Sequence, residues 1–274
     1  MRRLLALAVL VPLLAGCGDE TQQATSAAAA SRSYDGPLFV TREEATRPRA
    51  GAAGDVVACD TWGGGGFEDA EVFAEGATAD GPDQALETAR SEGGGPWAFR
   101  AEDLRVAAET DDRVLYVAEV DGRPKQALIV HDGQGSEGAG GDGWYLESWA
   151  QCDPVELPAY AEEIGLQVWT DADGRPVPKS GLEAWLGPVH CGWESMVLLT
   201  LGERTYVREP LAELSDFFAE EYAEGVRVPR DAVDTGFERE GEQLWLAADR
   251  SRAYVGTRDD AELWPATVEP LGCD

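Results

Sequence analysis

The sequence predicts an α+β protein of two small disulfide-closed halves, each an antiparallel sheet with one main helix. Strand-length runs rich in Val, Leu, Tyr and Trp recur along both halves, and glycine, proline or aspartate bounds most of them. Each half also contains one segment with the apolar periodicity of a helix. Four cysteines fall so that two pairs can each bracket about half of the chain. These three observations together define the expected class.

The first half, residues 34–158, is expected to contain one helix and a meander of strands. Residues 82–92 begin with proline, which suits the first turn of a helix, and they are followed by a triple glycine that would end it. Four strand-length runs come next, at residues 104–109, 113–120, 125–131 and 144–151. Asp121-Gly122 is typical of the tight turn between two of these strands. One helix on an antiparallel sheet is the simplest arrangement.

The second half, residues 159–274, is expected to be richer in strands. Residues 166–178 read as a hairpin with Asp173-Gly174 at its tip. Residues 208–225 have an apolar stripe at helical spacing and predict the main helix of this half. Five short strands are expected at residues 195–201, 205–208, 243–247, 253–257 and 262–266.

The spacing of four cysteines favours two disulfides, Cys59 with Cys152 and Cys191 with Cys273, although two other pairings are possible. Loops of that length would stabilise each half by about 4 to 5 kcal/mol in the chain-entropy model. No pair has C-x-x-C spacing, so zinc binding and thioredoxin-like redox chemistry are not expected.

Residues 1–16 have the composition of a bacterial lipoprotein signal peptide. Two arginines precede an apolar run too short to span a bilayer, and the run ends in Leu14-Ala15-Gly16-Cys17. This ending is similar to the lipobox of bacterial lipoproteins. The similarity implies lipidation of Cys17, cleavage before it and acylation of the new amino terminus with chains such as palmitate.

Residues 17–33 contain no large apolar residue after Cys17 and predict a flexible tether. Each buried methylene contributes about 0.8 kcal/mol, so several acyl chains would hold the protein durably on the membrane. We therefore expect a monomer anchored by lipid on the extracytoplasmic face of the cell membrane. The alternative is an ordinary secretory signal that leaves Cys17 as a free thiol.

The chain is strongly acidic, with 22 Lys and Arg against 52 Asp and Glu and a net charge of −30. Loss of two arginines with the signal would lower the charge to −32. Such a chain repels phosphate backbones, which excludes nucleic acid as a partner. A protein or cationic partner is possible, although the charge can equally serve solubility. No cofactor is expected.

Candidate catalytic residues are few. A general base could come from His131, beside a glycine-rich loop, or from His190, beside Cys191. A disulfide at Cys191 would remove the adjacent nucleophile, and Ser195 does not lie in a G-x-S-x-G motif. We expect no catalytic residue and a non-enzymatic protein. The alternative is a cell-envelope hydrolase whose acids act near His131.

Acidic segments and tryptophans offer weaker candidates for binding. Asp171-Ala172-Asp173-Gly174 resembles the start of a calcium loop, but the later ligands are missing, so we expect a turn and no metal site. A calcium-stabilised surface protein is therefore a second alternative. Acids at i,i+4 spacing would line the predicted second helix, as a solvated face or a docking surface: Asp216, Glu220 and Glu224. Most of the nine tryptophans lie in predicted strands, where they would fill cores. Trp62 and Trp97, beside runs of glycine, are the better candidates for exposure and for stacking on a sugar.

Five segments carry a wider resemblance. They are Y-D-G-P-L from residue 34, A-G-D-V-V-x-C ending at Cys59, D-G-W-Y-L-E-S-W from 142, W-T-D-A-D-G-R-P-V-P from 169 and G-P-V-H-C-G-W-E-S from 187. On these segments the sequence resembles a group of actinobacterial lipoproteins of unknown function. The resemblance implies no ligand or catalytic residue. The sequence as a whole favours a lipid-anchored extracytoplasmic binding or interaction module.

Overall fold

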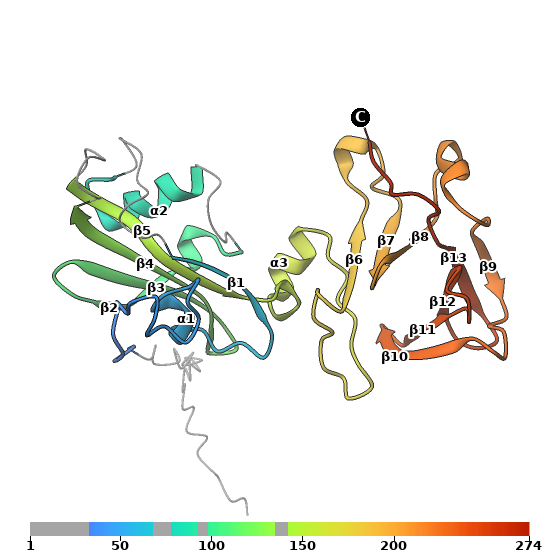
Figure 1. The fold of residues 1–274 in the computed structure, drawn as a ribbon, viewed down its shortest axis with the longest axis horizontal. Helices are drawn as coiled ribbons and strands as arrows, with labels where there is room; N and C mark the ends of the chain where they lie inside the picture. Colours follow the sequence, from blue (N-terminus) through green and yellow to red (C-terminus); the bar gives the residue numbers. More distant parts are fainter. Residues whose placement is uncertain (1–32, 68–77, 92–97, 135–141, 274) are drawn as a thin grey trace, which may run out of the picture. The chain divides into compact units, whose positions relative to one another are not determined.

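The computed structural model describes residues 33–67, 78–91, 98–134 and 142–273. This part of the chain is mostly β, with three antiparallel sheets and few helices (Figure 1). Within these ranges no helix is long and apolar enough to cross a membrane.

The first sheet has five strands in the order β1-β5-β4-β3-β2. Their bounds are β1 Trp62–Phe67, β2 Arg105–Glu109, β3 Arg113–Val120, β4 Arg123–Gln134 and β5 Asp142–Cys152. The predicted strands are confirmed, although β4 and β5 extend further than the sequence indicates. Asp121 and Gly122 connect β3 to β4 with positive φ angles of 53° and 71°, as their residue types favour.

The edge strand β1 was not expected, because glycine is unfavourable in strands. It pairs with β5 along Trp62 to Phe67. A Cβ at Gly66 would lie 2.1 Å from Nε1 of Trp149, and one at Gly63 would lie 2.4 Å from the carbonyl oxygen of Cys152. The glycines therefore permit a close approach that no larger residue would allow.

Both faces of the first sheet are covered, because alternate residues of its strands point to opposite sides. Leu115, Val117 and Ile129 pack in one cluster with α1, Ala53–Val56. Val114, Leu128 and Val130 pack in another with α2, Pro82–Ser91, whose Ala85 and Leu86 are buried. The predicted helix of the first half is therefore confirmed. Short helices follow: η1 Ala101–Asp103, η2 Pro154–Glu156 and, across the predicted boundary between the halves, α3 Pro158–Glu163.

The second half contains a three-stranded sheet, β6-β7-β8, and a five-stranded sheet in the order β10-β11-β12-β13-β9. Trp169, Tyr206 and Leu244 lie in one buried cluster that draws residues from both sheets. The bounds are β6 Leu182–Leu186, β7 Val197–Leu201, β8 Arg204–Arg208, β9 Ala223–Val226, β10 Val233–Arg239, β11 Glu242–Leu246, β12 Arg252–Gly256 and β13 Ala261–Pro265. β6, β9 and β10 were not predicted.

The predicted main helix at residues 208–225 is wrong. The structure has a 3-10 helix, η4 Ala212–Phe217, followed by strand β9. The apolar residues of the predicted stripe pack instead against Met196 and Val207, and the backbone of Phe218 bridges to Thr267. These tertiary contacts replace helical hydrogen bonds. The description of two halves with one main helix each therefore fits the first half only.

Two disulfides are present, Cys59–Cys152 and Cys191–Cys273, with Cα atoms 5.2 and 5.6 Å apart. These are the pairs that the spacing favoured. Cys152 is fully buried at the end of β5. Cys191 is the last residue of a short 3-10 turn, η3 Val189–Cys191, and is partly exposed. The boundary between residues 158 and 159 stays a prediction.

Candidate functional site

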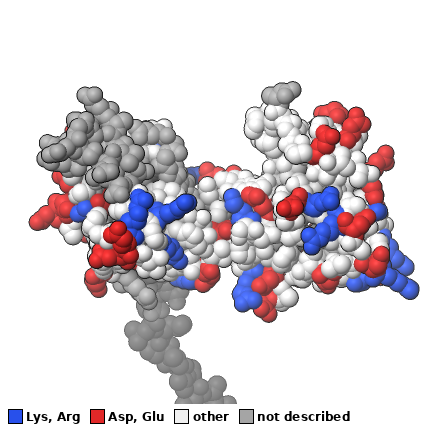
Figure 2. All heavy atoms as spheres, viewed as in Figure 1, with Lys and Arg blue, Asp and Glu red and all other residues white. Residues whose placement is uncertain are grey.

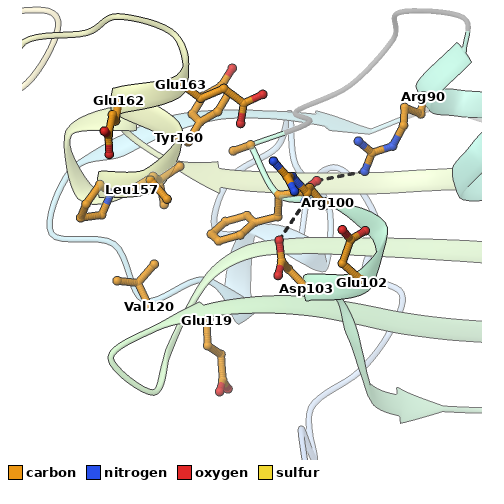
Figure 3. A pocket seen from close by; sticks show the side chains of 14 residues that line it. Arg90, Arg100, Glu102, Asp103, Glu119, Val120, Leu157, Tyr160, Glu162 and Glu163 are labelled. Carbon is orange, nitrogen blue, oxygen red and sulfur yellow. Dashed lines mark hydrogen bonds between the residues drawn. The ribbon is translucent and has the colours of Figure 1, made fainter.

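An open cleft of about 960 Å³ is lined by described residues of the first half and of α3 (Figure 3). It lies between α3 and the segment that runs from residue 98 through η1, with the end of β3 at its base. Apolar side chains line its interior, among them Phe99, Val120 and the buried Leu157. The cleft therefore offers an apolar surface that separate parts of the chain build together.

Hydrogen bonds fix one wall of the cleft. Arg90 of α2 donates from Nη2 to the carbonyl oxygen of Phe99 at 2.9 Å. Asp103 accepts from the backbone N–H of Arg100 at 3.2 Å, which caps the single turn of η1. Arg105 forms an ion pair with Glu119 at the base. The wall is thus held by side-chain contacts rather than by a long helix.

The opposite wall is held by a buried ion pair. Lys125 of β4 pairs with Glu156 of η2 and also donates to the carbonyl oxygen of Ala58 at 3.0 Å. Glu156 in turn accepts from the backbone N–H groups of Asp60 and Thr61. Because both charges are hydrogen-bonded, their burial is tolerated. This contact fixes the start of α3 to the first sheet.

Carboxylates dominate the charge of the cleft. Five acids line it against two arginines, Arg90 and Arg100. Glu102, Glu162 and Glu163 are exposed and form no ion pair within the described part of the chain. Figure 3 shows the glutamates of α3 beside Tyr160, across from the arginines. An apolar interior with an unneutralised acidic rim suits a ligand that carries positive charge next to an apolar group.

The lining of the cleft lacks three of the residue types that most often act as nucleophile or base. Among its described residues there is no serine, cysteine or histidine that could act as a nucleophile or a base. Sequence reasoning missed this cleft, because its residues come singly from distant segments and form no motif. No local signal would have revealed it.

His131, the predicted candidate base, lies in a charged cluster elsewhere on the first sheet. Its Nδ1 is 2.9 Å from the hydroxyl of Tyr145 and 3.2 Å from Oε1 of Glu147, and its Nε2 is 3.5 Å from Oδ2 of Asp112. Arg113 donates two hydrogen bonds of 2.9 Å to Glu147. Both ring nitrogens therefore face oxygen atoms of neighbouring side chains.

The cluster has the electrostatics of a structural ion-pair network. Burial alone would raise the pKa of Glu147, but hydrogen bonds from His131 and Arg113 outweigh it and hold the pKa below its ordinary value. Glu147 is only 4% exposed, and its carboxylate is paired with the Arg113 guanidinium. The hydrolase alternative at His131 stays a prediction.

The turn predicted at Asp171 is confirmed. The Asp171 carboxylate accepts from the backbone N–H groups of Asp173 and Arg175, each at 2.9 Å, and pairs with the Arg175 guanidinium. Gly174 has a positive φ of 76°. These internal contacts are those of an Asx-type turn, which is what the residue types favour.

The expected acidic helix face does not exist. Asp216 belongs to η4, Glu220 pairs with Arg252 at 2.6 Å, and Glu224 in β9 accepts from Tyr222 at 3.1 Å. The three acids therefore lie on different kinds of backbone, and no i,i+4 stripe forms.

One group of potential metal ligands occurs among the described residues: His190, Cys191 and Cys273. Both sulfur atoms are in the disulfide, which leaves His190 as a single ligand. The tryptophans behave mainly as expected, since Trp169, Trp245 and Trp264 are at most 4% exposed. Trp62 is covered by the guanidinium of Arg47, 4.1 Å from the ring centre. Cys17 and Trp97 lie outside the described residues.

On the face drawn in Figure 2, basic side chains lie among the acidic ones, so the excess charge does not gather into one acidic patch there. No family model matches the chain, and no match was found among curated proteins or solved structures. The geometry of the cleft is therefore the main guide to function.

Proposed function

We propose that the protein is a non-catalytic binding module, held as a monomer on the extracytoplasmic face of the membrane by lipid on Cys17. Its cleft takes a basic peptide segment in which lysine or arginine stands next to an apolar side chain. The observation that carries this proposal is the combination of an apolar interior with the exposed acids Glu102, Glu162 and Glu163.

The position outside the cytoplasm is supported by two features. Residues 1–16 have the pattern of a lipoprotein signal, and disulfides are typical of oxidising compartments. Lipid on Cys17 also accounts for the fifth cysteine, which has no partner in the two disulfides. A cleft displayed there would meet peptides and protein tails from outside the cell.

The chemistry of the cleft suggests how such a segment would bind. The apolar side chain would cover Phe99 and Val120, and the cation would lie beside the carboxylates of α3. Exposed charges at the rim of a site contribute mainly to the rate and selectivity of association, and salt screens them. Binding should therefore weaken as the ionic strength rises.

The test is calorimetric titration with a five-residue peptide that alternates lysine and leucine and has blocked ends. We expect the double variant Glu162→Gln and Glu163→Gln to bind about tenfold more weakly, which corresponds to about 1.4 kcal/mol. The matched control is Glu203→Gln with Glu242→Gln, two exposed acids outside the cleft. Equal loss in both double variants would show only a general charge effect and would contradict the proposal.

The anchor is tested separately by expressing the full chain and a Cys17→Ser variant in a host with lipoprotein processing. We expect the unaltered protein to partition into detergent and to carry an acylated amino terminus by mass spectrometry. The variant should lose both properties. An unmodified mature chain in the aqueous phase would contradict the lipid anchor and leave the cleft proposal intact.

A further inference from the structure

A second hollow, of about 320 Å³, lies on the outer face of the three-stranded sheet. Its wall includes Thr267, Pro270 and Leu271 from the chain that follows β13. The floor comes from the strands themselves, and β-strands hold side chains more firmly than loops do. The hollow is too small for a protein surface and has the volume of a small-molecule subsite.

The strand register arranges the floor in two rows. Glu183 of β6 stands opposite Thr200 of β7, which stands opposite Thr205 of β8. The neighbouring row on the same face begins with Trp185 opposite Leu198. Residues two apart in a strand share a face at a spacing of about 7 Å. A polar row and an aromatic row therefore lie side by side.

The polar row has hydrogen-bonding capacity to spare. Thr200 and Thr205 share one hydrogen bond of 3.0 Å between their hydroxyl groups. Since each hydroxyl has one donor and two acceptor positions, the pair retains one donor and several acceptors. Glu183 forms an ion pair with Lys179 at 3.4 Å. The side chains of Glu183 and Lys179 are 35% and 42% exposed. An exposed pair of this kind exchanges readily with other partners.

Trp185 supplies the aromatic surface. It is partly exposed, and the rest of the ring packs against the cluster of Val155, Ala161 and Leu166, which fixes its orientation. The ammonium of Lys179 lies 5.4 Å from the ring centre. The negative face of an indole attracts such positive groups, and it attracts polarised C–H groups for the same reason.

We propose that this hollow is a saccharide subsite that holds one pyranose ring of a neutral glycan. A pyranose has a face of C–H groups and a rim of hydroxyls. The C–H face would stack on Trp185, and adjacent hydroxyls would bond to the Glu183 carboxylate and the threonine pair. The Lys179 ammonium, which lies 5.4 Å from the centre of the same indole, would move aside to admit the pyranose. This site shares no residue with the acidic cleft, and the inference does not rest on the function proposed for that cleft.

The experiment uses saturation-transfer NMR and calorimetry on the mature chain with neutral oligosaccharides of two to four pyranose units. The panel contains glucose-, mannose- and N-acetylglucosamine-based members. We expect at least one to bind saturably, and Glu183→Gln and Trp185→Phe each to weaken it at least fivefold. Both substitutions retain most of the side-chain volume, so folding is preserved. The matched control is Glu203→Gln in the turn between β7 and β8, which should leave the affinity unchanged.

Two results would overturn the inference. One is the absence of saturable binding across the panel by the unaltered protein. The other is binding that the Glu183 and Trp185 variants leave unchanged, which would place the saccharide elsewhere. The Glu162 and Glu163 variants separate the two proposals, because they should weaken the basic peptide and leave the saccharide unaffected.

Discussion

The two disulfides close loops of similar length, 93 and 82 residues, in very different surroundings. Cys152 is fully buried within the core cluster of the first sheet, at the end of its second strand in spatial order. Cys273 is exposed at the end of the described chain, and Cys191 is partly exposed. From loop length alone, the two bonds would contribute nearly equally to the free energy of unfolding. We expect the surroundings of each bond to decide how much it contributes to stability.

The same contrast holds for two bidentate ion pairs. The side chains of Arg113 and Glu147 in the first sheet are 14% and 5% exposed. Those of Arg208 and Glu262, which join β8 to β13, are 38% and 24% exposed. Both arginines donate two hydrogen bonds of 2.8 to 2.9 Å. The bidentate geometry is the same, whereas the exposure to water differs, as do the further partners, His131 on Glu147 and Trp264 on Glu262.

The largest expected effect is the loss of unfolding free energy when a disulfide is removed, and it should differ between the two disulfides. Replacing Cys59 and Cys152 together by alanine should lower the free energy of unfolding by about 4 to 5 kcal/mol. Replacing Cys191 and Cys273 should cost only about half as much, because the freed chain end regains conformational entropy in the native state. Urea unfolding followed by circular dichroism measures both. Equal losses would show that loop closure alone determines the contribution of each bond.

The second largest effect should be the difference in stability lost when each ion pair is broken. Arg113→Met leaves the Glu147 carboxylate buried without its main partner, which should cost about 3 to 5 kcal/mol. Arg208→Met leaves Glu262 near water and should cost about 1 kcal/mol. The double variant Arg113→Met with Glu147→Gln should recover part of the larger loss. If the two single variants unfold at the same urea concentration, burial is not the deciding factor.

The first sheet could be predicted because its signals are local. Alternating apolar residues in β3 and β4 and the Asp121-Gly122 turn need no information from elsewhere in the chain. Strand β1 could not, since its glycines are explained only by close contacts with other parts of the chain, such as the Trp149 indole and the Cys152 carbonyl of the neighbouring strand. The tertiary context of a segment is invisible to propensity.

The error at residues 208–225 has a similar origin. The stripe of Leu211, Leu214 and Phe218 does face a core, as helical spacing suggests, but the backbone reaches it through a 3-10 turn. The strand bridge from Phe218 to Thr267 joins parts of the chain that are distant in sequence. The acidic cleft was unpredictable for the same reason, because only folding brings η1 and α3 together.

Two edge glycines sharpen the comparison between the five-stranded sheets. Gly66→Ala in β1 should cost about 2 kcal/mol, because its Cβ would overlap the Trp149 ring. At Gly236 in β10 a Cβ would meet no atom within 4 Å, but the backbone has a φ of 73°. Gly236→Ala should therefore cost about 1 kcal/mol of stability. Asparagine tolerates positive φ, so Gly236→Asn should recover stability, whereas Gly66→Asn should not. Gly64→Ala, with its nearest contact at 3.7 Å, is the control in thermal unfolding.

The smallest expected effect is the dependence of stability on pH. Burial would raise the pKa of Glu262, but hydrogen bonds from Arg208 and Trp264 hold it below its ordinary value of 4.5, as those on Glu147 do in the first sheet. A carboxylate whose pKa is lower in the folded state stabilises the protein above the unfolded pKa. That contribution disappears as the pH falls through the folded pKa. Unfolding free energy should therefore decline as the pH drops below about 4.5.

Single substitutions should show how much each region contributes to this decline of the unfolding free energy at low pH, here called the acid limb. Glu147→Gln should flatten it more than Glu262→Gln, because Glu147 is the more buried carboxylate, and each change should amount to about 1 kcal/mol. Burial raises the pKa of Asp153, so its contribution has the opposite sign and is lost as the pH rises. Asp153→Asn should therefore steepen the limb slightly. Urea titrations between pH 3 and 7 measure all three slopes, and identical slopes for the two glutamine variants would contradict the role of burial.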